Sequence, residues 1–148
     1  MCCQEKFDRD HESFGYTERL HIGIAPWNLP ISELTWGRYL SNEHTVIWIR
    51  WSGALPKCLV YHNGICIPNA IVDTESITWS SHELRLPKVV MRNDTIGKSV
   101  FRKFTSIMKM FPSAIMGLRE TKWCGTGTLF HEGKLVDSGV VIHELVRW

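Results

Sequence analysis

Hydrophobic and polar residues alternate along most of the chain, which is the pattern of β-strands whose two faces meet different surroundings. The alternation is clear over Gly15 to Ile24, resumes over Leu34 to Leu40, and is strongest over His44 to Trp51. The last of these segments is apolar on both faces, which is typical of a strand at the centre of a sheet. Pro26 and Pro30 separate the first two segments and predict a loop or a strand crossing there.

Two hairpins follow from the turn residues. Asn63-Gly64 predicts a tight turn, because both residues readily take positive φ, and it pairs Tyr61 with Cys66 in the flanking strands. Near the C-terminus, a four-residue loop after Phe130 would pair Phe130 with Leu135.

The C-terminal register also assigns faces to candidate side chains. Counting back from the four-residue loop pairs Trp123 with Ile142 and Thr121 with Glu144. We therefore expect Trp123 and Glu144 on one face of this hairpin, a face that is mostly apolar.

Eight to ten short strands, with turns every 8–12 residues, predict an all-β fold, either an antiparallel barrel or a sandwich. Lys98 to Met110 is ambiguous: its apolar spacing fits a short helix but also permits a strand, and its basic residues read as a solvated face. We expect at most one short helix, a flexible tail over residues 1–14 and a single domain over residues 15–148.

Composition adds limits rather than a function. The chain has 148 residues, of which 44% are hydrophobic and 22% charged, as in a soluble globular protein. No stretch approaches the roughly 20 apolar residues of a membrane helix, so we expect no integral membrane segment. The net charge of +2 is too small to indicate nucleic acid as a partner.

The cysteines and histidines exclude two kinds of site. Five cysteines without a CxxC pair argue against a disulfide framework or a zinc site, so we expect five free thiols. The seven histidines show no HxH or HxxxH spacing, and we expect no metal.

Gly125-Thr126-Gly127 lies within a strand pattern and is interpreted as a bulge or barrel corner, not a nucleotide loop. The N-terminus lacks an apolar signal region, which favours the cytoplasm.

Three stretches carry a family resemblance: Gly15-Tyr16-x-Glu18 with Pro26-Trp27, Trp36-Gly37-Arg38, and the closing segment Gly139 to Trp148. The arrangement resembles the C-terminal half of the lipocalin-like proteins grouped with hydroxyneurosporene synthase, the carotenoid 1,2-hydratase, and with AttH-like proteins. The resemblance implies an antiparallel lipocalin-like barrel. Members usually have two such halves and this chain has room for one, so it also implies a second half or a homodimer as partner.

Hydration of an isolated double bond, the reaction that the resemblance implies, needs an acid in apolar surroundings. A carboxylic acid in such a pocket can stay protonated near neutrality. Glu144, beside Trp123 on the predicted apolar face, is the leading candidate, and Glu18 is the second. The alternative role of each is an ion pair with Arg119 or Arg38 that closes the barrel.

Four residues are candidates for ligand contact. Trp36 and Arg38 share one face of their strand, where the guanidinium is either paired with a carboxylate or anchors a ligand carbonyl or carboxylate. Trp123 also shares its predicted face with polar residues, and Tyr16 completes the set.

Three functions stay open at this point. The chain is a binding module for a hydrophobic small molecule such as a lipid, terpenoid or polyene; or a hydratase, isomerase or cyclase that acts on an apolar substrate by carboxylic-acid catalysis; or a structural half-domain whose interior is filled by its own side chains. None of these requires a cofactor. The lining of the barrel interior distinguishes them.

Overall fold

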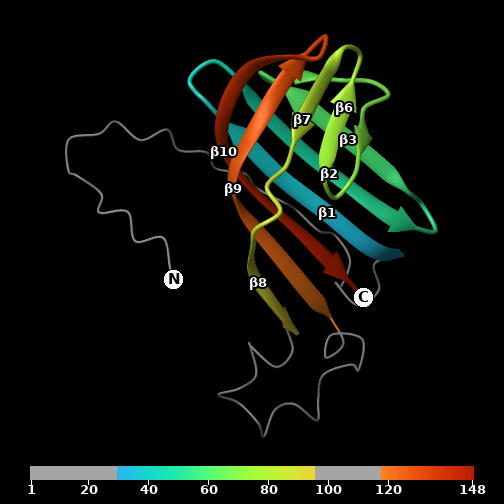
Figure 1. Ribbon diagram of the computed structural model, residues 1–148. Coiled ribbons are helices and arrows are strands. Elements are labelled where there is room, and N and C mark those ends of the chain that lie inside the picture. The colour runs from blue at the N-terminus through green and yellow to red at the C-terminus, as the bar shows by residue number, and fades with distance from the viewer. Residues whose placement is uncertain (1–29, 96–117) are drawn as a thin grey trace, which may run out of the picture.

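The structure is a computed structural model that describes residues 30–95 and 118–148. Its ten strands form a single antiparallel sheet, and these residues contain no helix (Figure 1). The predicted all-β antiparallel fold is therefore confirmed. The strands are β1 (Ile31–Leu40), β2 (Thr45–Gly53), β3 (Lys57–His62), β4 (Ile65–Cys66), β5 (Ile71–Val72), β6 (Ser76–Trp79), β7 (His82–Arg85), β8 (Val90–Thr95), β9 (Arg119–His131) and β10 (Lys134–Arg147).

Some predictions fall outside the described residues. They are the tail over 1–14, the strand over Gly15 to Ile24, the loop at Pro26 and the ambiguous segment Lys98 to Met110. In the part of the chain that is described, no helix is long and apolar enough to cross a membrane.

The sheet curls into a half-barrel. Nine strands follow one another in the order β4-β3-β2-β1-β10-β9-β7-β6-β5 and curl through 274°. The long strand β9 carries two partners along one edge: β7 pairs with residues 128–131 and β8 with residues 119–123. The two outermost strands of the sheet, β4 and β5, are joined by only four residues, Ile67–Ala70, so the two edges of the sheet are close along the chain.

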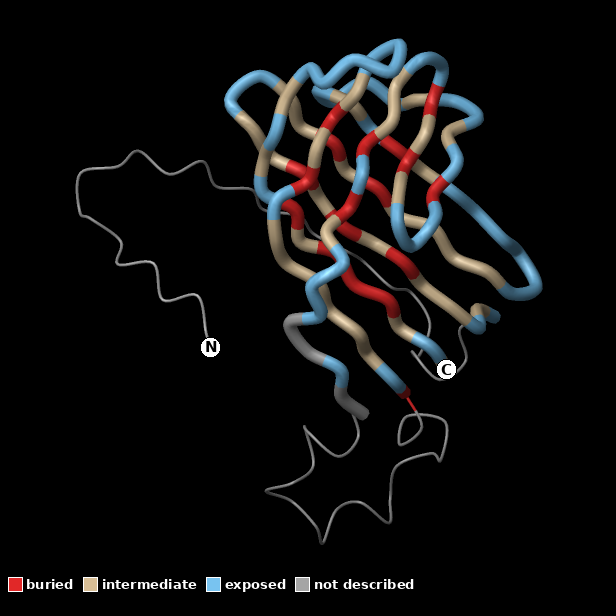
Figure 2. Tube along the Cα trace, viewed as in Figure 1, coloured by how far each residue is buried: buried red, intermediate tan, exposed pale blue. Residues whose placement is uncertain are grey.

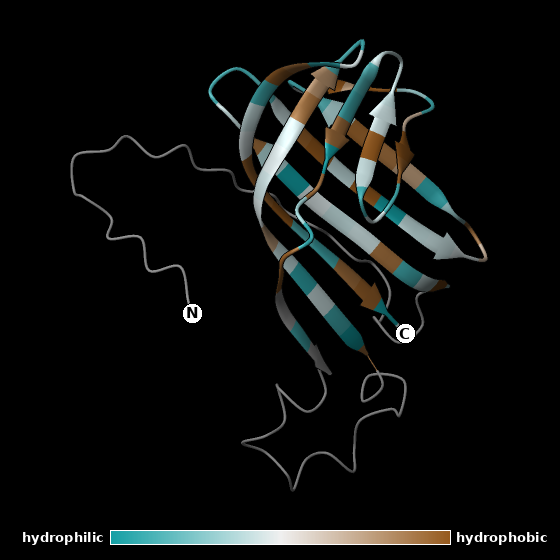
Figure 3. Ribbon diagram, in the orientation of Figure 1, coloured by the Kyte–Doolittle hydropathy of each residue, from teal (hydrophilic) through white to brown (hydrophobic). Residues whose placement is uncertain are grey.

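The hydrophobic core lies on the concave face of this curl. Along the strands, buried and partly exposed residues alternate, as Figures 2 and 3 show for burial and hydropathy. Full burial of one aliphatic or aromatic side chain contributes roughly 1.5–3 kcal/mol. The core cluster contains residues from strands at both ends of the strand order. It consists of Tyr39, Val46, Trp48, Val60, Val72, Ile77, Trp79, Leu84, Leu86, Leu129 and Val141.

The Asn63-Gly64 hairpin forms as predicted. Asn63 and Gly64 have φ of 49° and 79°, and Tyr61 pairs with Cys66. The Asn63 side chain also joins two turns, because its Oδ1 accepts from the backbone N–H of Thr45 at 2.7 Å and its Nδ2 donates to the Glu43 carbonyl at 3.2 Å. The three described cysteines are free, as expected: Cys58, Cys66 and Cys124.

The predicted C-terminal register is only half right. Phe130 pairs with Leu135 as expected, and the turn tightens to Glu132-Gly133. A bulge between Leu135 and Asp137 then adds one residue to β10, which shifts the rest of the strand by one place. The expected Trp123–Ile142 and Thr121–Glu144 pairs are therefore wrong: Trp123 pairs with His143, and Glu144 with Lys122.

Strand β1 has a glycine, Gly37, at the point where side chains of the neighbouring strands β2 and β10 contact each other. A Cβ at Gly37 would lie 2.4 Å from Cζ2 of Trp48 on β2 and 2.5 Å from Cβ of His143 on β10. Both side chains are 1% exposed. Gly37 thus allows two large rings from non-adjacent strands to come together above β1.

We predict that Gly37→Ala is destabilising. The added methyl group must displace two buried rings, and overpacking of this kind costs about 1–3 kcal/mol. Urea denaturation measures the change in the free energy of unfolding. Ser138→Ala, at an exposed position on β10, is the control and should shift it by no more than about 0.5 kcal/mol. Equal stability of the two variants would contradict the role given to Gly37.

Candidate functional site

The structure brings together three of the residues predicted from sequence and separates the fourth. Trp36 lies directly opposite Glu144 across β1 and β10, and Arg38 is two residues further along the same face. This is the convex face, away from the core. Trp123 pairs with His143 and therefore lies on the concave face, so its predicted placement beside Glu144 is wrong. Tyr16 and Glu18 lie outside the described residues.

The bulge in β10 accounts for this separation. Because side chains alternate between faces, a slip of one residue moves every later side chain to the other face. Lys122, rather than Thr121, now lies opposite Glu144. Nothing in the residues Leu135-Val136-Asp137 marks a bulge by composition, so the sequence carried no signal for it.

Glu144 has a partner that the sequence did not suggest. Glu144 is 6% exposed, and its carboxylate forms an ion pair with the ammonium of Lys122 on the neighbouring strand. Removing water from a carboxylate is costly unless an opposite charge compensates, and Lys122 provides that charge. Glu144 thus forms an ion pair, which was the alternative to its role as a catalytic acid. Its partner is Lys122 and not one of the expected arginines.

A row of aromatic rings contributed by three strands crosses the concave face. Trp48 on β2 and His143 on β10 have ring centroids 6.3 Å apart, and Trp123 on β9 stacks on His143 at 4.6 Å with an angle of 12° between the rings. We call Trp48, His143 and Trp123 the aromatic row. It runs from the fully buried Trp48 to Trp123, which is half-buried.

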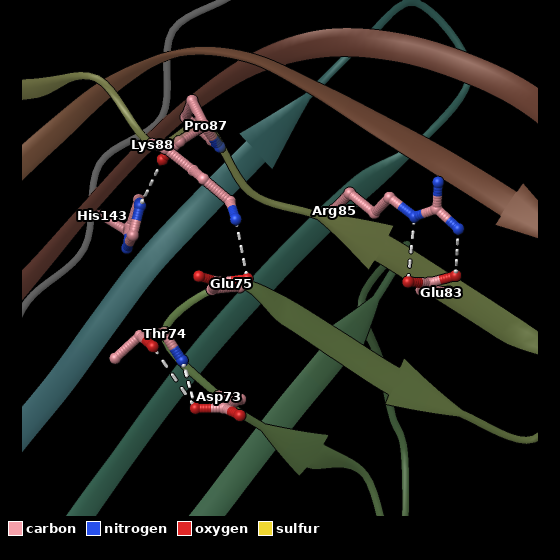
Figure 4. Close-up of polar contacts among 8 residues, drawn as sticks. All are labelled: Asp73, Thr74, Glu75, Glu83, Arg85, Pro87, Lys88 and His143. Atoms are coloured by element: carbon pink, nitrogen blue, oxygen red, sulfur yellow. Dashed lines mark hydrogen bonds and ion pairs between the residues drawn. The ribbon is translucent and has the colours of Figure 1, made fainter.

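The aromatic row contains two buried polar atoms that have no hydrogen-bond partner among the described residues: Nε1 of Trp48 and Nδ1 of His143. On its other side the His143 ring meets the Pro87 carbonyl, with Nε2 and the oxygen 3.4 Å apart (Figure 4). Burial lowers the pKa of His143, so the ring is neutral at pH 7. The Pro87 carbonyl can only accept, which puts the hydrogen on Nε2 and leaves Nδ1 as an acceptor.

Sequence reasoning missed His143 as a site residue because it assigned His143 to the other face. The available signal was the residue itself, a histidine within an apolar strand. A histidine in such a place is more often a packed ring than a ligand contact, and only the pairing with Trp123 shows its surroundings.

A second group of rings lies at the end of the half-barrel formed by the turns. His44 Nδ1 and His62 Nε2 are 3.0 Å apart, and His62 also contacts the rings of Trp79 and His82 at centroid distances of 5.4 and 5.6 Å. His82 stacks on Trp79 at 5.1 Å and on His131 at 4.3 Å. We call His44, His62, Trp79, His82 and His131 the histidine cluster.

The surroundings of His62 and His82 favour the neutral form of these two rings. Burial, and then the neighbouring histidines, lower the pKa of His62 and of His82 below the ordinary value of 6.5. Asp137 lies nearby and accepts a hydrogen bond from the Ser41 hydroxyl, which lowers the pKa of its carboxyl group. Among the described residues, no group of three or more histidine, cysteine, aspartate or glutamate side chains is placed to hold a metal ion.

Two exposed ion pairs lie near the β6–β7 hairpin. Figure 4 shows Glu83 with Arg85 and Glu75 with Lys88, each with N–O distances of about 3 Å and largely open to solvent. Pairs of this kind contribute little to stability. They do not form part of either ring system.

Comparison of the chain with known proteins finds no matching family model, no matching curated protein and no matching solved structure. The candidate site therefore rests on its own geometry.

We predict that Lys122→Met lowers the free energy of unfolding by about 1–3 kcal/mol, because it leaves a buried carboxylate without its ammonium partner. Adding Glu144→Gln removes the stranded charge, so the double variant should recover part of the loss. Urea denaturation of both variants measures this.

The matched control is Lys88→Met, which breaks an exposed pair and should change stability very little. If Lys122→Met and Lys88→Met have the same effect, the buried pair does not support the sheet in the way described.

Proposed function

We propose that this half-barrel binds a small, largely apolar molecule that carries a hydroxyl group, at the aromatic row. One observation carries the proposal: two buried hydrogen-bonding atoms, Trp48 Nε1 and His143 Nδ1, lie in neighbouring rings and have no partner in the part of the chain that the structure describes. An unmade hydrogen bond at a buried atom costs about 1–3 kcal/mol. A ligand that supplies both partners recovers that free energy on binding.

The chemistry of the two atoms selects the ligand class. The indole N–H of Trp48 is a donor only, and His143 Nδ1 is an acceptor in the neutral ring. A hydroxyl group can accept from the first and donate to the second, whereas a ketone or an ether can only accept. The Trp123 ring offers a flat apolar surface at the half-buried end of the row, which suits a planar or unsaturated hydrocarbon.

The sequence resemblance points to the same ligand class. Proteins grouped with the carotenoid 1,2-hydratase handle polyenes, and a terpenoid or polyene alcohol combines the hydrocarbon and the hydroxyl group that the row favours. The curled antiparallel half-barrel supports the lipocalin-like part of this resemblance in outline. A second lipocalin-like half or a homodimer stays part of the proposal, as does the cytoplasm, where the free thiols of Cys58, Cys66 and Cys124 are stable.

A specific observation favours one other function, the structural half-domain. The centre of the concave face is filled by the protein's own side chains, and Tyr39, Ile77, Leu84 and Leu129 have no exposed surface. The hydratase or cyclase hypothesis gains no such support. Its leading acid, Glu144, lies on the convex face, away from the aromatic row, in an ion pair with Lys122.

The test uses all-trans-retinol as the probe and its methyl ether as the matched probe without a donor. We expect retinol to quench tryptophan fluorescence saturably and to bind more tightly than the ether. Trp123→Ala should weaken retinol binding by about 1–3 kcal/mol, the scale of a lost aromatic contact.

Trp36→Ala is the control, because Trp36 lies on the convex face and should leave the affinity unchanged. Circular dichroism checks that both variants are folded. Absence of saturable quenching by either probe would overturn the binding proposal and leave the structural half-domain. An effect of Trp36→Ala larger than that of Trp123→Ala would move the site to the convex face.

A further inference from the structure

The histidine cluster joins parts of the sheet that are far apart along it. His62 is on β3, near one end of the strand order, whereas Trp79 and His82 are on β6 and β7, near the other end. Between β3 and β6 in that order lie β2, β1, β10, β9 and β7. Contact between His62 and Trp79 therefore exists only because the sheet curls. The cluster closes the half-barrel at its turn end.

Two other polar contacts cross the same gap. Arg50 Nη1 donates to the Val72 carbonyl at 3.2 Å, and Cys58 Sγ donates to the Ala70 carbonyl at 3.7 Å. A guanidinium stays charged at every pH that the fold survives, and burial raises the pKa of the Cys58 thiol. Neither contact changes between pH 5 and 7.5, whereas His62 and His82 in the cluster gain protons as the pH falls below 6.5.

We propose that the histidine cluster is an acid-sensitive clasp, which holds β3 against β6 and β7 while its rings are neutral and releases them when the rings are protonated. The contact between His62 and His82 shows how this works, because their ring centroids are only 5.6 Å apart. Protonation of both rings removes the acceptor nitrogen of each ring and places two positive charges next to each other in partly buried surroundings.

The groups around His62 and His82 set the direction of the pH response. His44 precedes β2, His131 comes from β9 and the neutral Trp79 from β6. Asp137 on β10 acts on the cluster through His44, and its lowered pKa keeps it ionised throughout this range. The Tyr39 phenol on β1, whose pKa is raised by burial, stays neutral. The titrating groups are therefore histidines.

The direction in which closure of the half-barrel changes with pH follows from the lowered pKa values of His62 and His82. Because His62 and His82 have pKa values below 6.5 in the folded state, the open state binds more protons than the closed state. Closure is complete above pH 6.5, weakens as the pH falls below it, and reaches a constant lower level below the folded pKa values. Each unit of pKa difference changes the closing equilibrium about tenfold.

The experiment measures local opening by amide hydrogen exchange on the full chain, at pH 7.5 and pH 5.0, corrected for the intrinsic pH dependence of exchange. EDTA is present throughout so that no metal bridges the imidazoles. We expect protection of β3, β6 and β7 to fall about tenfold or more at pH 5.0, which is a larger factor than for β1 and β10, where His143 is the ring with a lowered pKa. His62→Gln with His82→Gln should reduce the pH effect on β3, β6 and β7 to under about twofold.

His143→Gln is the matched control, since His143 is also buried and neutral but lies outside the cluster. This variant should keep the pH-dependent opening of β3, β6 and β7. An unchanged pH response in the His62/His82 double variant, or a uniform loss of protection over all strands, would overturn the proposal.

The wild-type chain supplies a second readout in case the double variant does not fold. The C–H signals of the His62 and His82 rings, followed by nuclear magnetic resonance, give their titration midpoints. We expect both ring midpoints below 6.5, and we expect the loss of protection to fall between those midpoints and pH 6.5. A midpoint of opening above 6.5, or one unrelated to either ring, would refute the clasp. The proposed ligand plays no part in any of these measurements.

Discussion

The curl of the sheet depends on how closely the concave side chains of β1, β9 and β10 can approach one another. Gly37 lets Trp48 and His143 meet across β1, and Gly127 makes room for Val141, whose Cγ2 lies 2.4 Å from where a Cβ would be. Larger residues at these two positions would hold the neighbouring side chains apart and flatten the sheet. A flatter sheet would leave β6 and β7 too far from β3 to complete the core. The core, the aromatic row and the histidine cluster all follow from this close approach.

The alternation of hydrophobic and polar residues was sufficient to predict the strands but not their register along the whole chain. The Asn63-Gly64 hairpin was predictable residue by residue, because the turn chemistry fixes the pairing on both sides. The hairpin between β9 and β10 was predictable only as far as the Phe130–Leu135 pair. Beyond it, one extra residue in β10 reversed the faces, and the residues at the bulge, Leu135-Val136-Asp137, carry no local signature of it.

The same reasoning explains which parts of the candidate site were predictable. Trp36 and Arg38 share a face because they are two residues apart in one strand, a fact that no register can alter. Glu144 joins them on the convex face, but Trp123 does not, since its position depends on the register of two strands. The histidine cluster was out of reach of sequence reasoning altogether. Its members come from five different segments and meet only through the curl, and none of the spacings between them is a known motif.

The aromatic row and the histidine cluster both contain neutral histidine rings that are buried or partly buried. At pH 7 a buried imidazole behaves as an aromatic ring with one donor and one acceptor, so it stacks on tryptophan without the cost of burying a charge. His143 beside Trp123 and His82 beside Trp79 are both placed in this way. The cost appears only in acid, because the pKa values of His62, His82 and His143 all lie below 6.5 in the folded state. Packing that resembles an ordinary aromatic core therefore makes the stability of this half-barrel rise with pH from the folded pKa values up to about 6.5.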